Sequence, residues 1–319
     1  MMSRLKRGAR WMADVGGAFA ASRWLTRRLP RILMYHQFSA PGLALSGGTP
    51  VDLFRQQLAH ITRRYEPIRL HDLSRAYVTG EPLPPRSVAI TIDDGHASFL
   101  RWAFPVLQEL GVPATLFVVS DLLEPGRWLW TDQLMYLRAA IPTLASEAGL
   151  TALKQLPPPE RARRVEHMAR QAGVTIPSIP PEPYALLSRP QIKEIARSGL
   201  IEIGSHTRTH ATLSSIDGEQ SWDEVAGSRT DLAGSLDVKI DAFCYPNGHP
   251  CDYRPQHVAL AATAGYLCAT AAHFGFVTAA SDRFALPRIG CDGMDMTMFR
   301  KYVDGFEYLQ RRVRGERCW

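Results

Sequence analysis

The segment Val88-Ala89-Ile90-Thr91-Ile92-Asp93-Asp94-Gly95-His96 decides the fold, because an apolar run in it ends abruptly at two adjacent carboxylates and a glycine. Such a run followed by glycine is typical of a buried central strand that opens into a loop. The two aspartates therefore lie at the carboxyl end of that strand. Adjacent carboxylates repel each other, which favours a cation that neutralises one of them and leaves the other free for a separate task.

Further ligands for such a cation are found much later in the chain, in Gly204-Ser205-His206-Thr207-Arg208-Thr209-His210. The two histidines are four residues apart, so a helical turn in this loop would bring both imidazoles to one face. Asp94, His206 and His210 would hold a divalent ion with positions left open for water and a substrate oxygen. The ion would acidify the water, and Asp93 would serve as the general base.

Around these segments the sequence alternates between predicted strands and helices. Strand, helix and strand between residues 88 and 119 make a βαβ unit, which indicates a parallel sheet. The predicted strands are 31–36, 67–70, 88–92, 114–119, 200–204, 242–245, 266–270 and 285–289, and a closing helix is predicted over 296–313. Because polar residues stand at the ends of many different strands, we predict an irregular (β/α) barrel of seven or eight strands.

Two regions depart from this alternation. Residues 121–187 contain two predicted helices and a proline cluster, and long connections in compact domains are usually functional or disordered. We therefore predict an insertion over the site at about 121–187, within a barrel domain that spans 31–319. The other region is a basic segment, 1–30, which precedes the first strand.

The basic segment 1–30 is predicted to be an amphipathic helix. The residues on one side of its helical wheel are Leu5, Met12, Val15 and Phe19. Such a helix either lies on an anionic membrane surface or packs on its own domain, and the sequence leaves both open. Asp14 interrupts the apolar run, which argues against a secretory signal. We expect a cytoplasmic protein, peripheral to the inner membrane face in the first alternative; secretion or a periplasmic location is less favoured.

Composition excludes several classes of protein. The 319 residues are 45% hydrophobic and 21% charged, which is ordinary for a soluble globular chain. The net charge of +6 and the pI near 9.2 arise largely from basic residues near the two ends, so we predict no nucleic-acid groove. Five cysteines, with no CxxC pair among them, indicate reduced thiols rather than disulfides or a zinc–cysteine site.

The motifs resemble those of the polysaccharide deacetylases of carbohydrate esterase family four. Thr91-Ile92-Asp93-Asp94-Gly95 is similar to the first motif, which supplies the base and one metal ligand, and 205–210 is similar to the second, which supplies two histidine ligands. Phe243-Cys244-Tyr245-Pro246-Asn247-Gly248 is similar to a variant of the third. The resemblance implies an irregular (β/α) barrel and one divalent ion, with zinc preferred over cobalt, nickel or iron. It also implies that Asn247 N–H holds the oxyanion and that Tyr245 lines the pocket.

Three departures from the family pattern need separate candidates. The third motif usually carries an arginine that braces the base, where this chain has Cys244; Arg288 is predicted to take that role from another strand, unless it is a surface arginine beside a turn. The fourth motif, with its tryptophan, is not recognisable. We assign Trp130, in the insertion, to substrate binding.

The third departure is the missing late histidine that supplies the general acid. Leu33-Met34-Tyr35-His36 resembles the arrangement in circularly permuted deacetylases of biofilm poly-N-acetylglucosamine, in which this strand comes first. His36 is therefore the predicted acid; the alternative is a half-buried histidine that satisfies a backbone carbonyl. His249 and His273 are spare candidates, and His96 is predicted to shape the mouth of the site.

These residues predict a metal-dependent N-deacetylase that removes an acetyl group from an N-acetylated sugar. The absence of a convincing signal favours a lipid-linked or nucleotide-linked glycan precursor, and an exported polysaccharide is the second choice. The alternatives are a deformylase or amidase acting on a small or lipid-linked amide, and a catalytically inactive carbohydrate-binding relative. The expected partners are the glycan and, in the interfacial alternative, the membrane surface.

Overall fold

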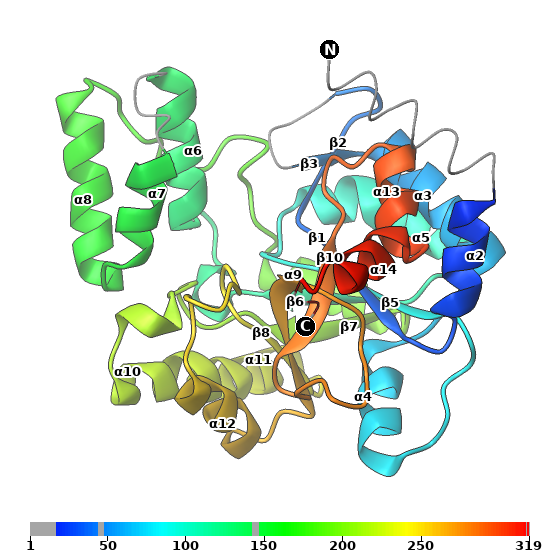
Figure 1. The fold of residues 1–319 in the computed structure, drawn as a ribbon. Coiled ribbons are helices and arrows are strands. Elements are labelled where there is room, and N and C mark those ends of the chain that lie inside the picture. The colour runs from blue at the N-terminus through cyan, green and yellow to red at the C-terminus, as the bar shows by residue number, and fades with distance from the viewer. Residues whose placement is uncertain (1–16, 44–47, 142–146, 317, 319) are drawn as a thin grey trace.

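The computed structural model describes residues 17–43, 48–141, 147–316 and 318, and its main feature is a closed parallel barrel (Figure 1). Seven strands follow one another around the ring in the order β1-β10-β9-β8-β7-β6-β5, and β5 pairs with β1 to close it. These strands are β1 Arg31–Tyr35, β5 Ser87–Ile92, β6 Ala114–Val118, β7 Ile201–Ser205, β8 Ala242–Cys244, β9 Cys268–Phe274 and β10 Leu286–Gly290. The predicted fold class, an irregular (β/α) barrel, is confirmed.

Strand β1 closes the ring of strands, because it pairs with β5 on one edge and with β10 on the other. All five of its residues pair with β5, and its Leu33 and Met34 pair with β10 on the other edge. The first and last barrel strands are therefore neighbours, so the end of β1 lies beside the end of β10. A short separate ladder, β2 Gln37–Ser39 with β3 Gly48–Pro50, follows β1.

Helices surround the barrel. They are α2 Ala18–Leu25, α3 Val51–Arg64, α4 Leu70–Thr79, α5 Phe104–Leu110, α6 Trp130–Ala140, α7 Glu147–Lys154, α8 Pro158–Gln171, α9 Arg189–Arg197, α10 Gly218–Trp222, α11 Ser228–Leu236, α12 Pro255–Thr263, α13 Met296–Val303 and α14 Phe306–Val313. Helix α9 begins after Ser188, which forms a capping box with Gln191 that satisfies backbone N–H groups at the helix start.

The barrel interior is apolar and closed at one end by α4. Side chains from six strands form one buried cluster, and they can meet only inside the ring; its strand members are Ile32, Ala89, Phe117, Ala242, Cys244, Cys268 and Leu286. Leu70 and Leu73 of α4 join the same cluster, so this helix covers one end of the barrel. The strands' carboxyl ends form the other end, where the candidate site residues lie.

Two of the predicted element boundaries are wrong. The strand expected at 67–70 is limited to β4, Glu66–Pro67, because Leu70 already begins the helix that closes the barrel. The single closing helix expected at 296–313 is broken into α13 and α14 at Gly305, where φ is 88°. A Cβ at this glycine would lie 2.6 Å from Thr26 Oγ1, so close contact with the N-terminal region also requires glycine.

Helices α6, α7 and α8 lie within the region predicted as an insertion. Figure 1 shows them grouped together at one side of the barrel. They have their own buried cluster, made of Trp130, Leu134, Leu137, Leu153, Val165 and Ala169. The boundaries of the insertion and of the barrel domain stay a prediction.

The described part of the basic segment packs on the barrel's closing helices. Phe19 of α2 meets Phe306 edge to face at 5.5 Å, and Arg23 forms an ion pair with Asp304 at 2.9 Å. The other predicted apolar positions, Leu5, Met12 and Val15, lie outside the described residues. Within the described ranges, every helix is too short or too polar to cross a bilayer. Membrane contact and a cytoplasmic location stay predictions.

Asp304 is expected to be a large contributor to stability. Its buried carboxylate accepts hydrogen bonds from His60 Nε2 at 3.0 Å and Tyr65 OH at 2.7 Å, besides pairing with Arg23. Asp304→Ala leaves Arg23 uncompensated in a buried position, so we expect the free energy of unfolding to fall by about 3–5 kcal/mol. Urea denaturation measures this loss, with Asp72→Ala on exposed α4 surface as the control. A loss below about 1 kcal/mol for Asp304→Ala would contradict the assignment.

Candidate active site

The two adjacent aspartates follow β5 at the open end of the barrel. Asp94 has a left-handed backbone, with φ 73°, and Gly95 follows with φ 76°. A Cβ at Gly95 would lie 3.2 Å from Val118 Cγ1, so glycine suits both the turn and the close packing. This turn leaves both carboxylates lining one cleft.

Asp94 meets both predicted histidine ligands. Its Oδ1 lies 3.4 Å from His206 Nε2 and 3.3 Å from His210 Nε2, and all three donor atoms lie within 4.8 Å of one another. His206 Nδ1 contacts the carbonyl of Cys244 at 2.7 Å, which directs Nε2 toward Asp94. One carboxylate and two imidazoles fit a catalytic divalent site with open coordination positions, which a closed structural site lacks.

The loop that carries the histidines brings them together without the helical turn that their spacing would allow. Thr207 and His210 have left-handed backbones, with φ 67° and 59°, and these turns bring the two rings together. A β-branched residue such as threonine rarely adopts this conformation. Asp94 and Asn247 are also left-handed, so four of the six described non-glycine residues with positive φ lie at this site. Such strain persists only where surrounding contacts enforce it.

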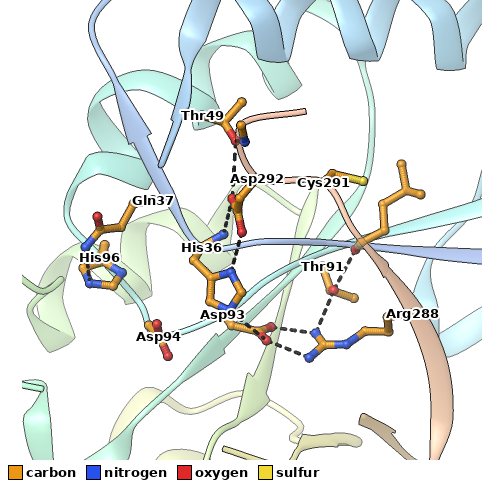
Figure 2. Close-up of polar contacts among 12 residues, drawn as sticks. His36, Gln37, Thr49, Thr91, Asp93, Asp94, His96, Arg288, Cys291 and Asp292 are labelled. Atoms are coloured by element: carbon orange, nitrogen blue, oxygen red, sulfur yellow. Dashed lines mark hydrogen bonds and ion pairs between the residues drawn. The ribbon is translucent and has the colours of Figure 1, made fainter. Parts of the chain in front are cut away.

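Asp93 is held by Arg288, as predicted (Figure 2). The guanidinium Nη1 donates to Oδ1 at 2.8 Å and Nη2 to Oδ2 at 2.7 Å, and Nη1 also reaches Thr91 Oγ1 at 3.0 Å. Arg288 is 1% exposed, so its alternative interpretation as a surface arginine is wrong. Burial alone would raise the pKa of Asp93, but the adjacent guanidinium outweighs it and lowers that pKa. Asp93 is therefore an ionised carboxylate.

Cys244 stands where the family motif usually has the bracing arginine. Its Sγ lies 3.4 Å from Asp93 Oδ2 and 3.1 Å from Arg288 Nη2. The thiol is buried beside Asp93, and Arg288 reaches the same carboxylate from β10.

His36 points toward Asp93 from the end of β1 (Figure 2). Its Nε2 lies 3.8 Å from Asp93 Oδ2, and its Nδ1 lies 2.6 Å from Asp292 Oδ2. A carboxylate therefore holds the imidazole, where the alternative interpretation expected a backbone carbonyl. Burial disfavours the charged ring, but Asp292 outweighs it and raises the pKa of His36 to about 10. The imidazole is therefore protonated at neutral pH.

Sequence reasoning missed Asp292. Its Oδ1 also accepts from His36 N–H at 3.1 Å and Thr49 Oγ1 at 3.3 Å, so it fixes the orientation of the ring. One feature of the sequence could have identified Asp292. It is followed by Gly293 just after β10, as Asp94 is followed by Gly95 just after β5.

His96 lies on the cleft wall, where it was predicted to shape the mouth. Its Nε2 contacts Asp132 Oδ2 at 2.9 Å and Gln37 Nε2 at 2.8 Å. Burial works against the charged ring, but Asp132 outweighs it and raises the pKa of His96. This contact joins the barrel to α6, a connection that sequence reasoning did not foresee.

The third motif also borders the cleft. Tyr245 stacks on Tyr253 with ring centroids 4.2 Å apart, and its hydroxyl donates to Phe284 O at 2.8 Å. Asn247 has φ 59°, and in the part of the chain that the structure describes its backbone N–H donates no hydrogen bond. That free donor is what oxyanion stabilisation requires.

Three other predicted residues have different positions. Trp130 is not among the residues that line the cleft: its buried indole donates to the carbonyl of His210 at 3.2 Å and lies under Arg161, so it supports the histidine loop. The predicted substrate contact of Trp130 is corrected accordingly. His249 lines the cleft, whereas the largely buried His273 does not.

The cleft holds about 560 Å³ and is bounded by the barrel and the inserted helices. The inserted region contributes Met135, Leu150, Lys154 and Tyr184 to its wall. Asp93, Asp94, His36 and Asn247 lie on the barrel side of the same cleft. This volume lies within the range of small-molecule binding sites, about 300–1,000 Å³.

Sequence comparisons agree with these motifs. The polysaccharide deacetylase family model matches residues 80–269. The poly-beta-1,6-N-acetyl-D-glucosamine N-deacetylase of Escherichia coli K12 is 26% identical over 183 residues, which are 57% of this chain and only 19% of that relative's length. The putative polysaccharide deacetylase YxkH of Bacillus subtilis is 21% identical over 291 residues, which are 90% of this chain and 81% of that protein.

Solved structures share the fold. The Streptococcus pyogenes deacetylase PplD superposes with a TM-score of 0.62 at 20% identity, covering 86% of this chain and 98% of that one. IcaB from Ammonifex degensii gives a TM-score of 0.58 at 18% identity, covering 87% and 97%. Because the family model spans more than half of the sequence and includes both aspartates and both histidines, the chain belongs to the polysaccharide deacetylase family.

Proposed function

We propose that this protein is a metal-dependent N-deacetylase that hydrolyses the acetamido group of an amino sugar. One observation carries the proposal: Asp93, with both carboxylate oxygens held by Arg288, lies beside the ligand set Asp94, His206 and His210. A carboxylate that is not needed for metal binding is available as a base.

The chain's residues divide the chemistry between them. A divalent ion held by Asp94, His206 and His210 would supply an acidified water and a polarised carbonyl. Asp93 takes the proton from the attacking water, and the N–H of Asn247 donates to the developing oxyanion. His36, protonated beside Asp292, delivers a proton to the leaving nitrogen, so acetate and a free amine are released.

The proposal is tested by measuring acetate and free amine released from N-acetylated sugars by zinc-loaded protein. Equal amounts of both products are expected. Preferred turnover of N-formylated analogues would favour the deformylase alternative. Binding of sugar without any turnover would favour the inactive carbohydrate-binding relative.

The charges in the cleft support an anionic substrate. Three of the carboxylates that line it pair with an arginine or a histidine: Asp93 with Arg288, Asp132 with His96, and Asp292 with His36. The fourth, Asp94, belongs to the proposed metal-ligand set. Lys154 lines the same cleft and has no carboxylate partner among the described residues. We therefore propose a sugar that carries a phosphate group, as lipid-linked and nucleotide-linked precursors do.

Lys154→Met is expected to raise KM for N-acetylglucosamine 1-phosphate by about fivefold with kcat unchanged, because one partly exposed charge pair is worth about 1 kcal/mol. KM for neutral N-acetylglucosamine should stay the same. Lys193→Met on α9, outside the cleft, is the control. An equal effect on both sugars would contradict a phosphate contact.

The pH dependence of kcat is expected to depend on Asp292. The carboxylate raises the pKa of His36, so Asp292→Asn should lower it. His36 must be protonated to act as the acid; the alkaline fall in kcat should therefore move to lower pH, by about one unit or more. Initial rates across the pH range measure this, and an unmoved alkaline limb would exclude His36 as the acid.

A further inference from the structure

Glu224 contacts the loop that joins the two histidine ligands. It lies in a π-helical turn, Asp223–Gly227, between α10 and α11, and its side chain is largely buried. Its Oε2 accepts hydrogen bonds from the backbone N–H groups of Arg208 at 2.8 Å and Thr209 at 3.0 Å. Its Oε1 accepts from Thr209 Oγ1 at 2.5 Å. All three donors belong to residues between His206 and His210.

The loop needs these acceptors because it is not a helix. Its left-handed turns at Thr207 and His210 prevent the regular backbone hydrogen bonds that a helix would supply. The carbonyls of Thr207 and Arg208 accept from the backbone N–H groups of Ser120 and Asp121, at 3.1 and 3.0 Å. The backbone N–H groups of Arg208 and Thr209 instead donate to the carboxylate of Glu224.

The loop is therefore held from several sides. Residues after β6 bind its carbonyls, Trp130 binds the carbonyl of His210, and Glu224 binds its N–H groups. A carboxylate makes the strongest of these contacts, since hydrogen bonds to a charged acceptor are about twice as strong as neutral ones. Removing it leaves two N–H groups without their acceptor in a strained segment, which favours a relaxed loop with separated imidazoles.

We infer that Glu224 is a positioning residue that sets the affinity of Asp94, His206 and His210 for their divalent ion. The inference rests on the proposed function, because it assumes that this ligand set binds metal. Glu224 acts through the backbone of the loop: its hydrogen bonds go to Arg208 and Thr209, and it is not among the residues that line the cleft. Sequence reasoning did not single out Glu224.

The test is zinc affinity, measured by competition with a chromophoric chelator. Glu224→Ala is expected to weaken zinc binding by about 10–100-fold, which is typical when a group that orients a metal ligand is lost. Glu224→Gln keeps one oxygen acceptor, so its loss of zinc affinity should be smaller. Thr209→Val removes only the hydroxyl donor, so its loss of zinc affinity should be the smallest of the three. Glu219→Ala, an exposed acid on α10, is the control and should bind zinc like the parent.

Two further measurements separate positioning from a general loss of structure. Excess zinc should restore kcat to Glu224→Ala, and the melting temperature of metal-free Glu224→Gln should match that of the metal-free parent. Parental zinc affinity in folded Glu224→Ala overturns the inference and leaves the proposed function intact. If Glu224→Ala does not fold, parental affinity in both Glu224→Gln and Thr209→Val overturns it. A parent protein that binds no zinc overturns the proposed function and this inference together.

Discussion

Asp93→Asn is expected to lower kcat by about 10³-fold while the protein still binds one equivalent of zinc. The amide cannot accept the proton that leaves the attacking water. The ion's proposed ligands are Asp94, His206 and His210, and the substitution changes none of them. Loss of the base should therefore be separable from loss of the metal.

The same substitution has a structural cost that must be measured. Arg288 is buried and donates two hydrogen bonds to Asp93, so asparagine leaves its charge uncompensated. Breaking a buried pair in this way costs about 3–5 kcal/mol. Circular dichroism and zinc content should be recorded beside the acetate-release rate, with Asp72→Asn, an exposed residue of α4 at the opposite end of the barrel, as the control. Folded, zinc-loaded Asp93→Asn with more than a tenth of the parent's kcat would contradict the assignment.

The parts of the site that could be predicted are residues that can be recognised from their immediate neighbours in the sequence. The pair Asp93-Asp94 ends an apolar run, and His206 follows another, so their position at strand ends could be inferred without knowing how the strands assemble. Closure of the barrel then places these ends together, and the resemblance to a known family supplied the roles. Arg288 was predicted only because the expected arginine was missing from position 244.

The parts that could not be predicted depend on contacts between distant segments. Asp292 binds His36 across 256 positions of sequence, and only the pairing of β1 with β10 brings them together. Trp130 was assigned to substrate binding, but its indole donates a hydrogen bond to the carbonyl of His210, a contact between distant segments. The spacing of the two histidines indicated that they could converge, but the backbone that brings them together could not be read from it, because left-handed residues take the place of a helical turn.

His206→Ala is expected to lose both zinc and activity, in contrast to Asp93→Asn. The imidazole is fixed at one nitrogen by the carbonyl of Cys244 and directs the other toward Asp94, so alanine removes a pre-oriented ligand. Because loss of an orienting group alone costs 10–100-fold in metal affinity, loss of the ligand itself should cost about 100-fold or more. Acetate release should fall to background at zinc concentrations that saturate the parent.

Measuring Asp93→Asn and His206→Ala side by side distinguishes the role of the base from that of the metal ligand. If His206→Ala retained stoichiometric zinc at the parent's affinity, the ion would be bound elsewhere and Asp94 would need a different function. Zinc added to His206→Ala at millimolar concentration should restore part of kcat, because Asp93 and His36 remain in place. Adding Asp93→Asn to that variant should abolish the restored activity, since the base is still required when the ion is supplied at high concentration.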